Sequence, residues 1–119
     1  MPWWWSVNKV FNSRSAVVLN LQNPREKIWG VLLSVNAFGV TIRGIDINSF
    51  DDWTRSVANQ TGTIGLSTLF VPMMRVEKAI LDETGGMVKS LSDQFLERVG
   101  QSVLDHMNLP DEDDFHVSF

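Results

Sequence analysis

The segment 15–47 constrains the fold most, because it reads as three consecutive β-strands. Apolar side chains at every second position, as in Val17, Leu19 and Leu21, are typical of a strand with one buried face. The second strand is apolar on both faces and contains Gly30, so we expect it to be central and strongly bent. Turn-forming residues separate the three strands, which are predicted at 16–22, 27–35 and 40–47. The pattern predicts an antiparallel meander.

The rest of the chain predicts two further strands and two helical segments. Ser49 begins a short helix inside an insertion, 48–65, that we expect to cover one face of the sheet. Pro72 cannot donate to a ladder, so it separates the fourth and fifth strands, which are predicted at 67–71 and 74–81. An apolar residue at about every fourth position predicts a C-terminal helix over 89–107, in which Gly100 favours a bend or two short helices.

Composition predicts one soluble domain. The chain has 119 residues with 44% hydrophobic residues, which suits a single core over residues 1–109. It has no cysteine and no apolar run that could span a bilayer, so we expect a cytoplasmic protein without a membrane partner. The net charge of −4 arises largely from an acidic tail, 110–119, while the body is near neutral. This balance argues against strong general affinity for phosphate backbones.

The second strand carries a recognisable pattern of residues. Gly30, Leu32, Val35 and Asn36 stand where Sm-like proteins have a Gly, a Leu two positions later, and an apolar residue followed by an acid. Residues 16–82 therefore resemble the five-stranded, SH3-type small barrel of the Sm-like family. The run from Phe70 to Glu77 is also similar to that of uncharacterised bacterial proteins of Sm-like fold. The resemblance implies a mainly β fold. The insertion after the third strand and the helix after the barrel differ from the usual Sm-like arrangement.

The resemblance implies a non-enzymatic homo-oligomer that binds RNA. An open barrel leaves unpaired backbone groups at its edges, so we expect the fourth and fifth strands of neighbouring subunits to pair in a ring. The turn after the second strand and the link between the last two strands are the places where the family contacts RNA. Both differ here from the family pattern. The candidate ligand-binding residues are Asn36, Phe38, Arg43 and Arg75.

An alternative function is a protein interaction module or scaffold. Exposed tryptophans seldom remain in water, so a dense tryptophan block at the N-terminus indicates packing over the core, a subunit contact or a membrane-interface anchor, and the few basic residues nearby argue against the anchor. In this alternative the insertion 48–65 and the tryptophans present a site for a protein partner. The candidate interaction residues are Trp3, Trp4, Trp5 and Trp53.

The sequence contains no catalytic or metal-binding signature. His106 and His116 have no second ligand at metal-binding spacing, and the acidic tail lacks the spacing of a calcium loop. Asp51 and Asp52 are better explained as favourable charges at a helix start than as an acid and base pair. We therefore expect no enzyme activity, no metal and no cofactor.

Overall fold

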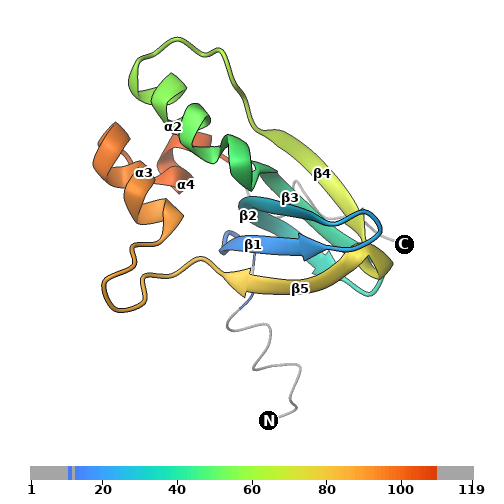
Figure 1. The fold of residues 1–119 in the computed structure, drawn as a ribbon. Coiled ribbons are helices and arrows are strands. Elements are labelled where there is room, and N and C mark those ends of the chain that lie inside the picture. The colour runs from blue at the N-terminus through green and yellow to red at the C-terminus, as the bar shows by residue number, and fades with distance from the viewer. Residues whose placement is uncertain (1–10, 12, 110–119) are drawn as a thin grey trace.

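A computed structural model describes residue 11 and residues 13–109, and Figure 1 shows its arrangement. The described residues form five strands, three α-helices and two short 3-10 helices. The strands are β1 (Ala16–Leu21), β2 (Glu26–Asn36), β3 (Gly39–Asp46), β4 (Ser67–Pro72) and β5 (Val76–Leu81). The helices are η1 (Ile47–Ser49), α2 (Phe50–Ala58), η2 (Met73–Arg75), α3 (Leu91–Val99) and α4 (Val103–Met107). The protein is thus mainly β, and all five predicted strands are confirmed.

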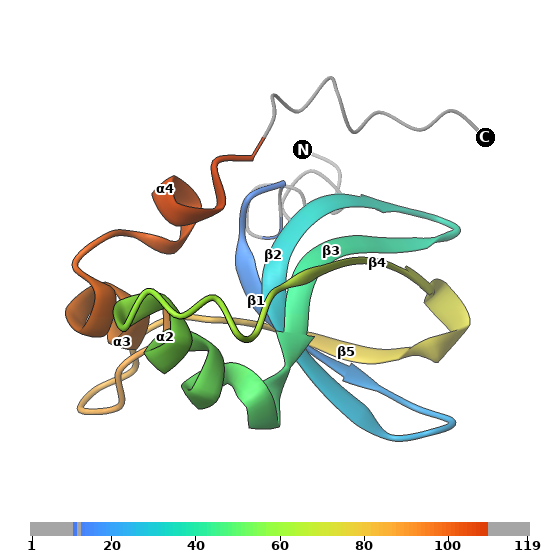
Figure 2. The same ribbon diagram turned by 90° about the horizontal axis from the view of Figure 1, so that it is seen from above.

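The five strands form one antiparallel sheet in the order β4-β3-β2-β1-β5. The central position of β2 confirms the prediction from its two apolar faces. The strands β4 and β5 are the two edges, and within the described residues they do not pair with each other. Figure 2 shows the sheet curling, so that the two edge strands meet at the end where η2 joins them.

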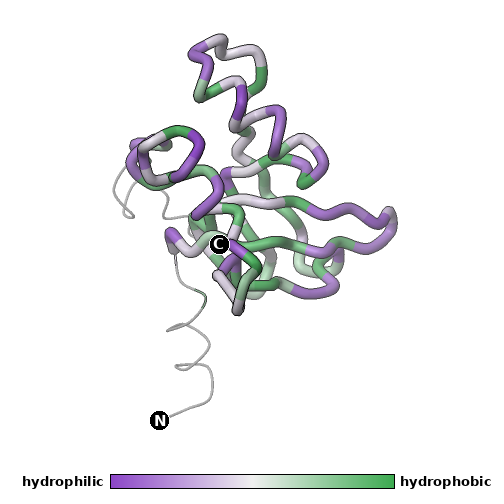
Figure 3. The backbone as a smooth tube through the Cα atoms, turned by 60° about the vertical axis from the view of Figure 1, so that its left-hand side comes forward, coloured by the Kyte–Doolittle hydropathy of each residue, from purple (hydrophilic) through white to green (hydrophobic). Residues whose placement is uncertain are grey.

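The sheet buries both of its faces, and β2 contributes to each. On the inner face, Ile28 and Leu32 pack with side chains from β1, β3 and β4. On the outer face, Trp29 and Val31 pack against the helices. Because successive side chains of a strand point to opposite faces, one strand serves two cores. Figure 3 shows the hydrophobic stretches concentrated in the sheet, whereas the helices alternate between hydrophobic and hydrophilic residues.

Two facing glycines allow β2 and β3 to approach closely. Gly30 lies opposite Gly44 in the register of the two strands. A Cβ atom on Gly30 would lie 2.5 Å from the Arg43 carbonyl oxygen and 2.7 Å from the Gly44 Cα atom. A Cβ atom on Gly44 would lie 2.3 Å from the Trp29 carbonyl oxygen. The expected close approach at Gly30 is therefore present, and it needs a glycine on both strands.

An aromatic cluster joins the helices to the outer face of the sheet. Trp53 from α2 stacks on Phe95 from α3 with a centroid distance of 4.9 Å, and it lies 5.6 Å from Trp29 of β2. Phe50 meets Trp29 edge-on at 4.8 Å. Such pairs add to the burial of their large apolar surfaces. The insertion thus covers one face of the sheet, as predicted, and its helix does so through buried rings.

The C-terminal helical segment is two helices rather than one continuous helix over 89–107. Gly100 has a φ of 84° and ends α3 in the left-handed conformation, which favours glycine. Ser102 then begins α4, because its side chain accepts a hydrogen bond from the backbone N–H of Asp105. The break lets α3 and α4 both contribute to the aromatic core, through Phe95 and Val103.

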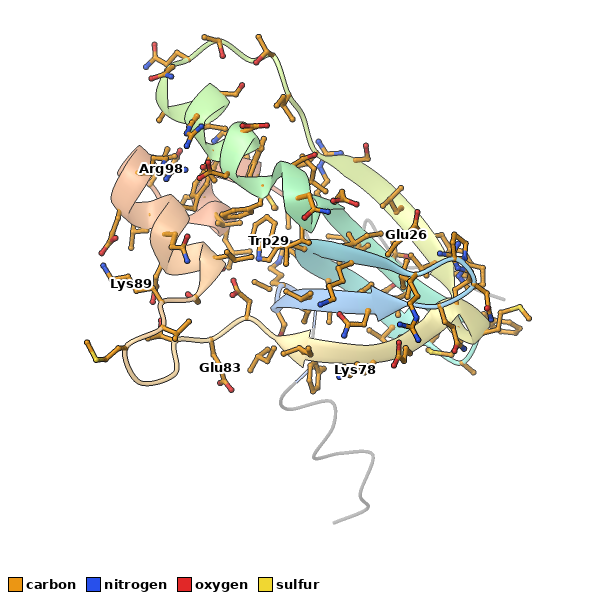
Figure 4. All side chains as sticks on the ribbon, in the orientation of Figure 1. Glu26, Trp29, Lys78, Glu83, Lys89 and Arg98 are labelled. Atoms are coloured by element: carbon orange, nitrogen blue, oxygen red, sulfur yellow. The ribbon has the colours of Figure 1, made fainter. Side chains whose placement is uncertain are left out.

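Asp82 connects the end of β5 to the start of α3. One carboxylate oxygen accepts a hydrogen bond from the Trp29 indole at 3.1 Å, and the two oxygens accept the backbone N–H groups of Leu91 and Ser92 at 2.9 Å each. The Ser92 hydroxyl donates a further bond of 2.7 Å. A carboxylate is favourable at a helix N-terminus, where backbone N–H groups lack partners. Figure 4 shows Trp29 between the sheet and the helices.

We expect Gly30→Ala to lower the free energy of unfolding by about 2 kcal/mol, because the added methyl group would meet rigid backbone atoms of β3. Chemical denaturation followed by circular dichroism measures the loss. Gly85→Ala is the matched control, because no heavy atom lies within 4 Å of the added Cβ atom. Equal stability of the two variants would contradict the account of β2.

We expect Asp82→Ala to cost about 2 kcal/mol of stability, because it leaves the Trp29 indole N–H and two helix N–H groups without their acceptor. The neighbouring Glu83 is exposed, so Glu83→Ala is the control. Thermal unfolding of both variants makes the comparison. If Asp82→Ala unfolded like the wild-type protein, the carboxylate would not hold α3 to the sheet.

Candidate functional site

The link between the two edge strands is held by two turns that are distant in sequence. On one side, the backbone N–H of Gln22 donates to the Arg75 carbonyl at 2.8 Å, and the Gln22 amide donates to the Met74 carbonyl at 3.0 Å. On the other side, the backbone N–H of Met73 donates to the Phe38 carbonyl at 2.9 Å. The β1–β2 turn, the β2–β3 turn and η2 therefore form one end of the molecule, which we call the loop end.

Arg75 is part of the framework of the loop end. Its Nε donates to the Gln22 carbonyl at 2.9 Å, and one terminal nitrogen, Nη2, donates to the Pro24 carbonyl at 3.1 Å. The same nitrogen forms an ion pair of 2.8 Å with Glu26. Because these contacts join η2 to the β1–β2 turn, Arg75 has a structural role in addition to its predicted one as a ligand residue.

Asn36 shapes the β2–β3 turn and leaves Phe38 on the surface. The Asn36 side-chain oxygen accepts the backbone N–H groups of Phe38 at 2.8 Å and of Gly39 at 3.2 Å. The asparagine thus caps the turn, as its acceptor oxygen predicts. The Phe38 side chain is 60% exposed. The sequence-based candidates Asn36, Phe38 and Arg75 therefore lie at the same end of the molecule.

Large apolar side chains are exposed at or beside the loop end. Gly39 lies against Phe70 of β4, since a Cβ atom on this glycine would be 2.8 Å from the phenyl ring. The exposed apolar residues at this end are Val35, Phe38, Phe70, Met73 and Met74. Exposed apolar residues that gather in one region commonly mark a contact surface. In β4, Val71 is buried and Phe70 is exposed, and the consecutive apolar residues Leu69, Phe70 and Val71 do not reveal this difference in the sequence.

Arg43 lies away from the loop end. It is on β3 opposite Thr68, and its guanidinium donates to the Thr68 hydroxyl at 3.2 Å. It lines a pocket beside α2. The four predicted ligand-binding residues therefore do not form a single site, because Arg43 and the other three are on separate parts of the sheet.

The edge strands differ in charge. The sequence of β4, Ser67–Pro72, contains no charged residue, and its Phe70 is exposed. The strand β5 carries Glu77 and Lys78 together with an exposed Ile80. Natural edge strands usually carry charges or irregularities that prevent pairing with other chains. The outer edge of β4 has no such charge, and its one irregularity, Pro72, is confined to the end of the strand.

Trp53 is not available for a protein partner. It is 2% exposed and lies at the centre of the aromatic cluster, so its prediction as an interaction residue is wrong. The physical reason is the amphipathic helix α2, which turns its large apolar side chains toward the sheet. Trp3, Trp4 and Trp5 lie outside the described residues, as do the acidic tail and His116.

Ion pairs occur at the surface between α2 and α3. Arg98 donates a hydrogen bond to Asp51, and this bond holds the pKa of that exposed carboxyl below its usual value of 3.8. Arg55 attracts the same carboxylate and lowers its pKa further. Figure 4 shows Arg98 reaching from α3 toward α2. Asp51 and Asp52 lie in the first turn of α2, where a negative charge is favourable.

The part of the chain that the structure describes contains no cluster of three or more residues suited to hold a metal ion. Its one histidine, His106, packs against the rings of Trp53 and Phe95.

No helix within residues 13–109 combines the length and the apolar character that crossing a bilayer requires.

Comparisons with protein-family models, with curated proteins and with solved structures found no match to this chain. The resemblance to Sm-like proteins therefore stays a prediction. The candidate functional site therefore consists of the loop end and the two edge strands, and only their geometry supports it.

Proposed function

We propose that this protein is a non-enzymatic Sm-like small barrel that assembles into a closed homo-oligomer. In this assembly, β4 of one subunit pairs with β5 of the next. The single observation that carries the proposal is the uncharged outer edge of β4 with its exposed Phe70. A sheet edge presents unpaired backbone N–H and C=O groups, and a second strand satisfies them.

The two edges suit each other in length and in side chains. Both strands have six residues. Each carries one large apolar side chain that is about half exposed, Phe70 at 50% and Ile80 at 47%. Because the two edges are different surfaces, their pairing is head-to-tail, and a head-to-tail contact closes into a ring when the rotation allows it. Closure removes every edge without open-ended growth.

We expect Phe70→Lys to convert the oligomer to monomers, because a lysine on an edge strand opposes pairing with another chain. Light scattering behind a sizing column measures the molar mass, and circular dichroism checks the fold. Val88→Lys is the control, since Val88 is 74% exposed and lies in the loop before α3.

Ile80→Lys on the opposite edge should have the same effect as Phe70→Lys, and it decides the matter if the first variant fails to fold. A wild-type protein that is monomeric overturns the proposal. That result would favour the alternative of an interaction module that meets its partner through the exposed apolar residues of the loop end.

The second candidate function is RNA binding by the assembled ring. The observation that favours it is the exposed ring of Phe38, whose backbone joins the two loops that the Sm-like resemblance assigns to RNA. An exposed aromatic side chain can stack on an unpaired base. The engaged guanidinium of Arg75 and the near-neutral body predict weak phosphate contacts.

We expect the protein to retain single-stranded oligouridylate in a filter-binding titration at low salt, and Phe38→Ala to weaken retention by about tenfold through the loss of one stacked base. Val88→Ala is the control. Absence of retention at low salt, where phosphate-driven affinity is greatest, overturns RNA binding and leaves the assembly proposal intact.

A further inference from the structure

A pocket of about 390 Å³ lies between α2, the loop that follows it and β3, on the opposite side of the sheet from the inner core. Figure 1 shows this loop leaving α2 and arching over to β4. The residues of α4 close another side of the pocket. The volume is within the range of pockets that hold small molecules.

One wall of the pocket is apolar, and the polar side chains of Ser56, Gln60 and His106 line other parts of it. Trp53 and Val57 contribute from α2, and Ile64 and Leu66 contribute from the loop. All four belong to the aromatic core or pack against it, so their positions are set by the fold. A ligand with an apolar body would therefore find a surface that already exists.

The loop is held in place by a buried serine. Ser56 is 5% exposed, and its hydroxyl oxygen accepts the backbone N–H of Thr63 at 3.0 Å. The Ser56 carbonyl accepts the backbone N–H of Thr61 at 3.1 Å. These bonds connect α2 to the loop that forms the pocket wall. The pocket therefore does not need a ligand to form.

Arg43 gives the pocket a positive charge that no acid among the described lining residues compensates. Among the described residues that line the pocket there is no aspartate and no glutamate. The guanidinium of Arg43 is bonded to the neutral hydroxyl of Thr68, and within the described part of the chain it forms no ion pair. By contrast, Arg75 and Arg98 both bind carboxylates. A half-buried cation without an anionic partner is favourably placed to receive one.

We infer that this pocket binds a small organic carboxylate. The carboxylate pairs with the Arg43 guanidinium, which matches carboxylate geometry with two parallel donors. The apolar part of the ligand lies against the wall formed by Val57, Ile64 and Leu66, which are partly exposed. The inference does not depend on the proposed assembly, because the pocket is formed by one chain and shares no residue with the outer edges of β4 and β5.

The test uses the full chain and 3-phenylpropionate as the probe, with backbone amide shifts in two-dimensional NMR as the readout. We expect saturable shifts in residues 56–66 and around Arg43. The neutral analogue 3-phenylpropanol lacks the carboxylate, and inorganic phosphate lacks the apolar body. We expect both to bind at least about tenfold more weakly than 3-phenylpropionate.

Two variants test the charge. Arg43→Gln should weaken binding of 3-phenylpropionate about tenfold or more, because it removes a charge-assisted pair. Gln60→Glu places a carboxylate in the lining without changing side-chain size and should also weaken binding, so it decides the matter if Arg43→Gln fails to fold. Lys78→Gln removes a positive charge from β5, away from the pocket, and should leave binding unchanged.

The inference is overturned if 3-phenylpropionate causes no saturable shift, if 3-phenylpropanol binds equally well, or if Arg43→Gln binds like the wild-type protein. Phe70→Lys should bind the probe normally. Loss of oligomers with retained probe binding would thus separate the two proposals.

Discussion

The rest of the structure depends on the burial of β2 on both faces. Ile28 and Leu32 belong to the inner core, while Trp29 belongs to the outer core. A strand buried in this way must have neighbours on both edges and layers on both sides. The close contact of Gly30 with Gly44 lets β3 follow the bend of β2. β2 therefore pairs with β1 and β3 and contributes to both hydrophobic clusters.

The outer core determines where the helices lie. Trp29 presents an apolar ring to α2 and an indole N–H to Asp82, so one side chain contacts the insertion and is linked through Asp82 to the start of α3. The Asp82 carboxylate accepts hydrogen bonds from two backbone N–H groups at the start of α3 that have no partner within the helix. Because the helices cover the outer face, the sheet meets solvent mainly at its loop end and along its two edges. These are the surfaces on which the assembly proposal rests. The pocket of Arg43, in contrast, is formed where the helices meet the sheet.

Much of the fold could be predicted from the sequence. Alternation and turn residues located all five strands to within about two residues, and the apolar character of 27–35 indicated a central strand. The candidate site was less predictable. Phe38 and Arg75 lie at the same loop end because Phe38 bonds Met73 and Arg75 bonds Gln22, contacts that sequence spacing does not reveal. Trp53 was predicted to be exposed but is buried. The sequence could not decide this, because a tryptophan in an insertion can either pack in the core or contact a partner.

The sequence by itself determined the local structure: the strands, the turn at Asn36, the break at Gly100 and the amphipathic helices. These features follow from interactions between near neighbours, such as backbone conformation, capping and side-chain period. The tertiary structure alone decided the sheet order, the joining of three loops at one end and the placing of Arg43 in a pocket whose described lining contains no acid. Those features depend on contacts between residues far apart in the chain, which form only when the sheet curls and its two faces are covered.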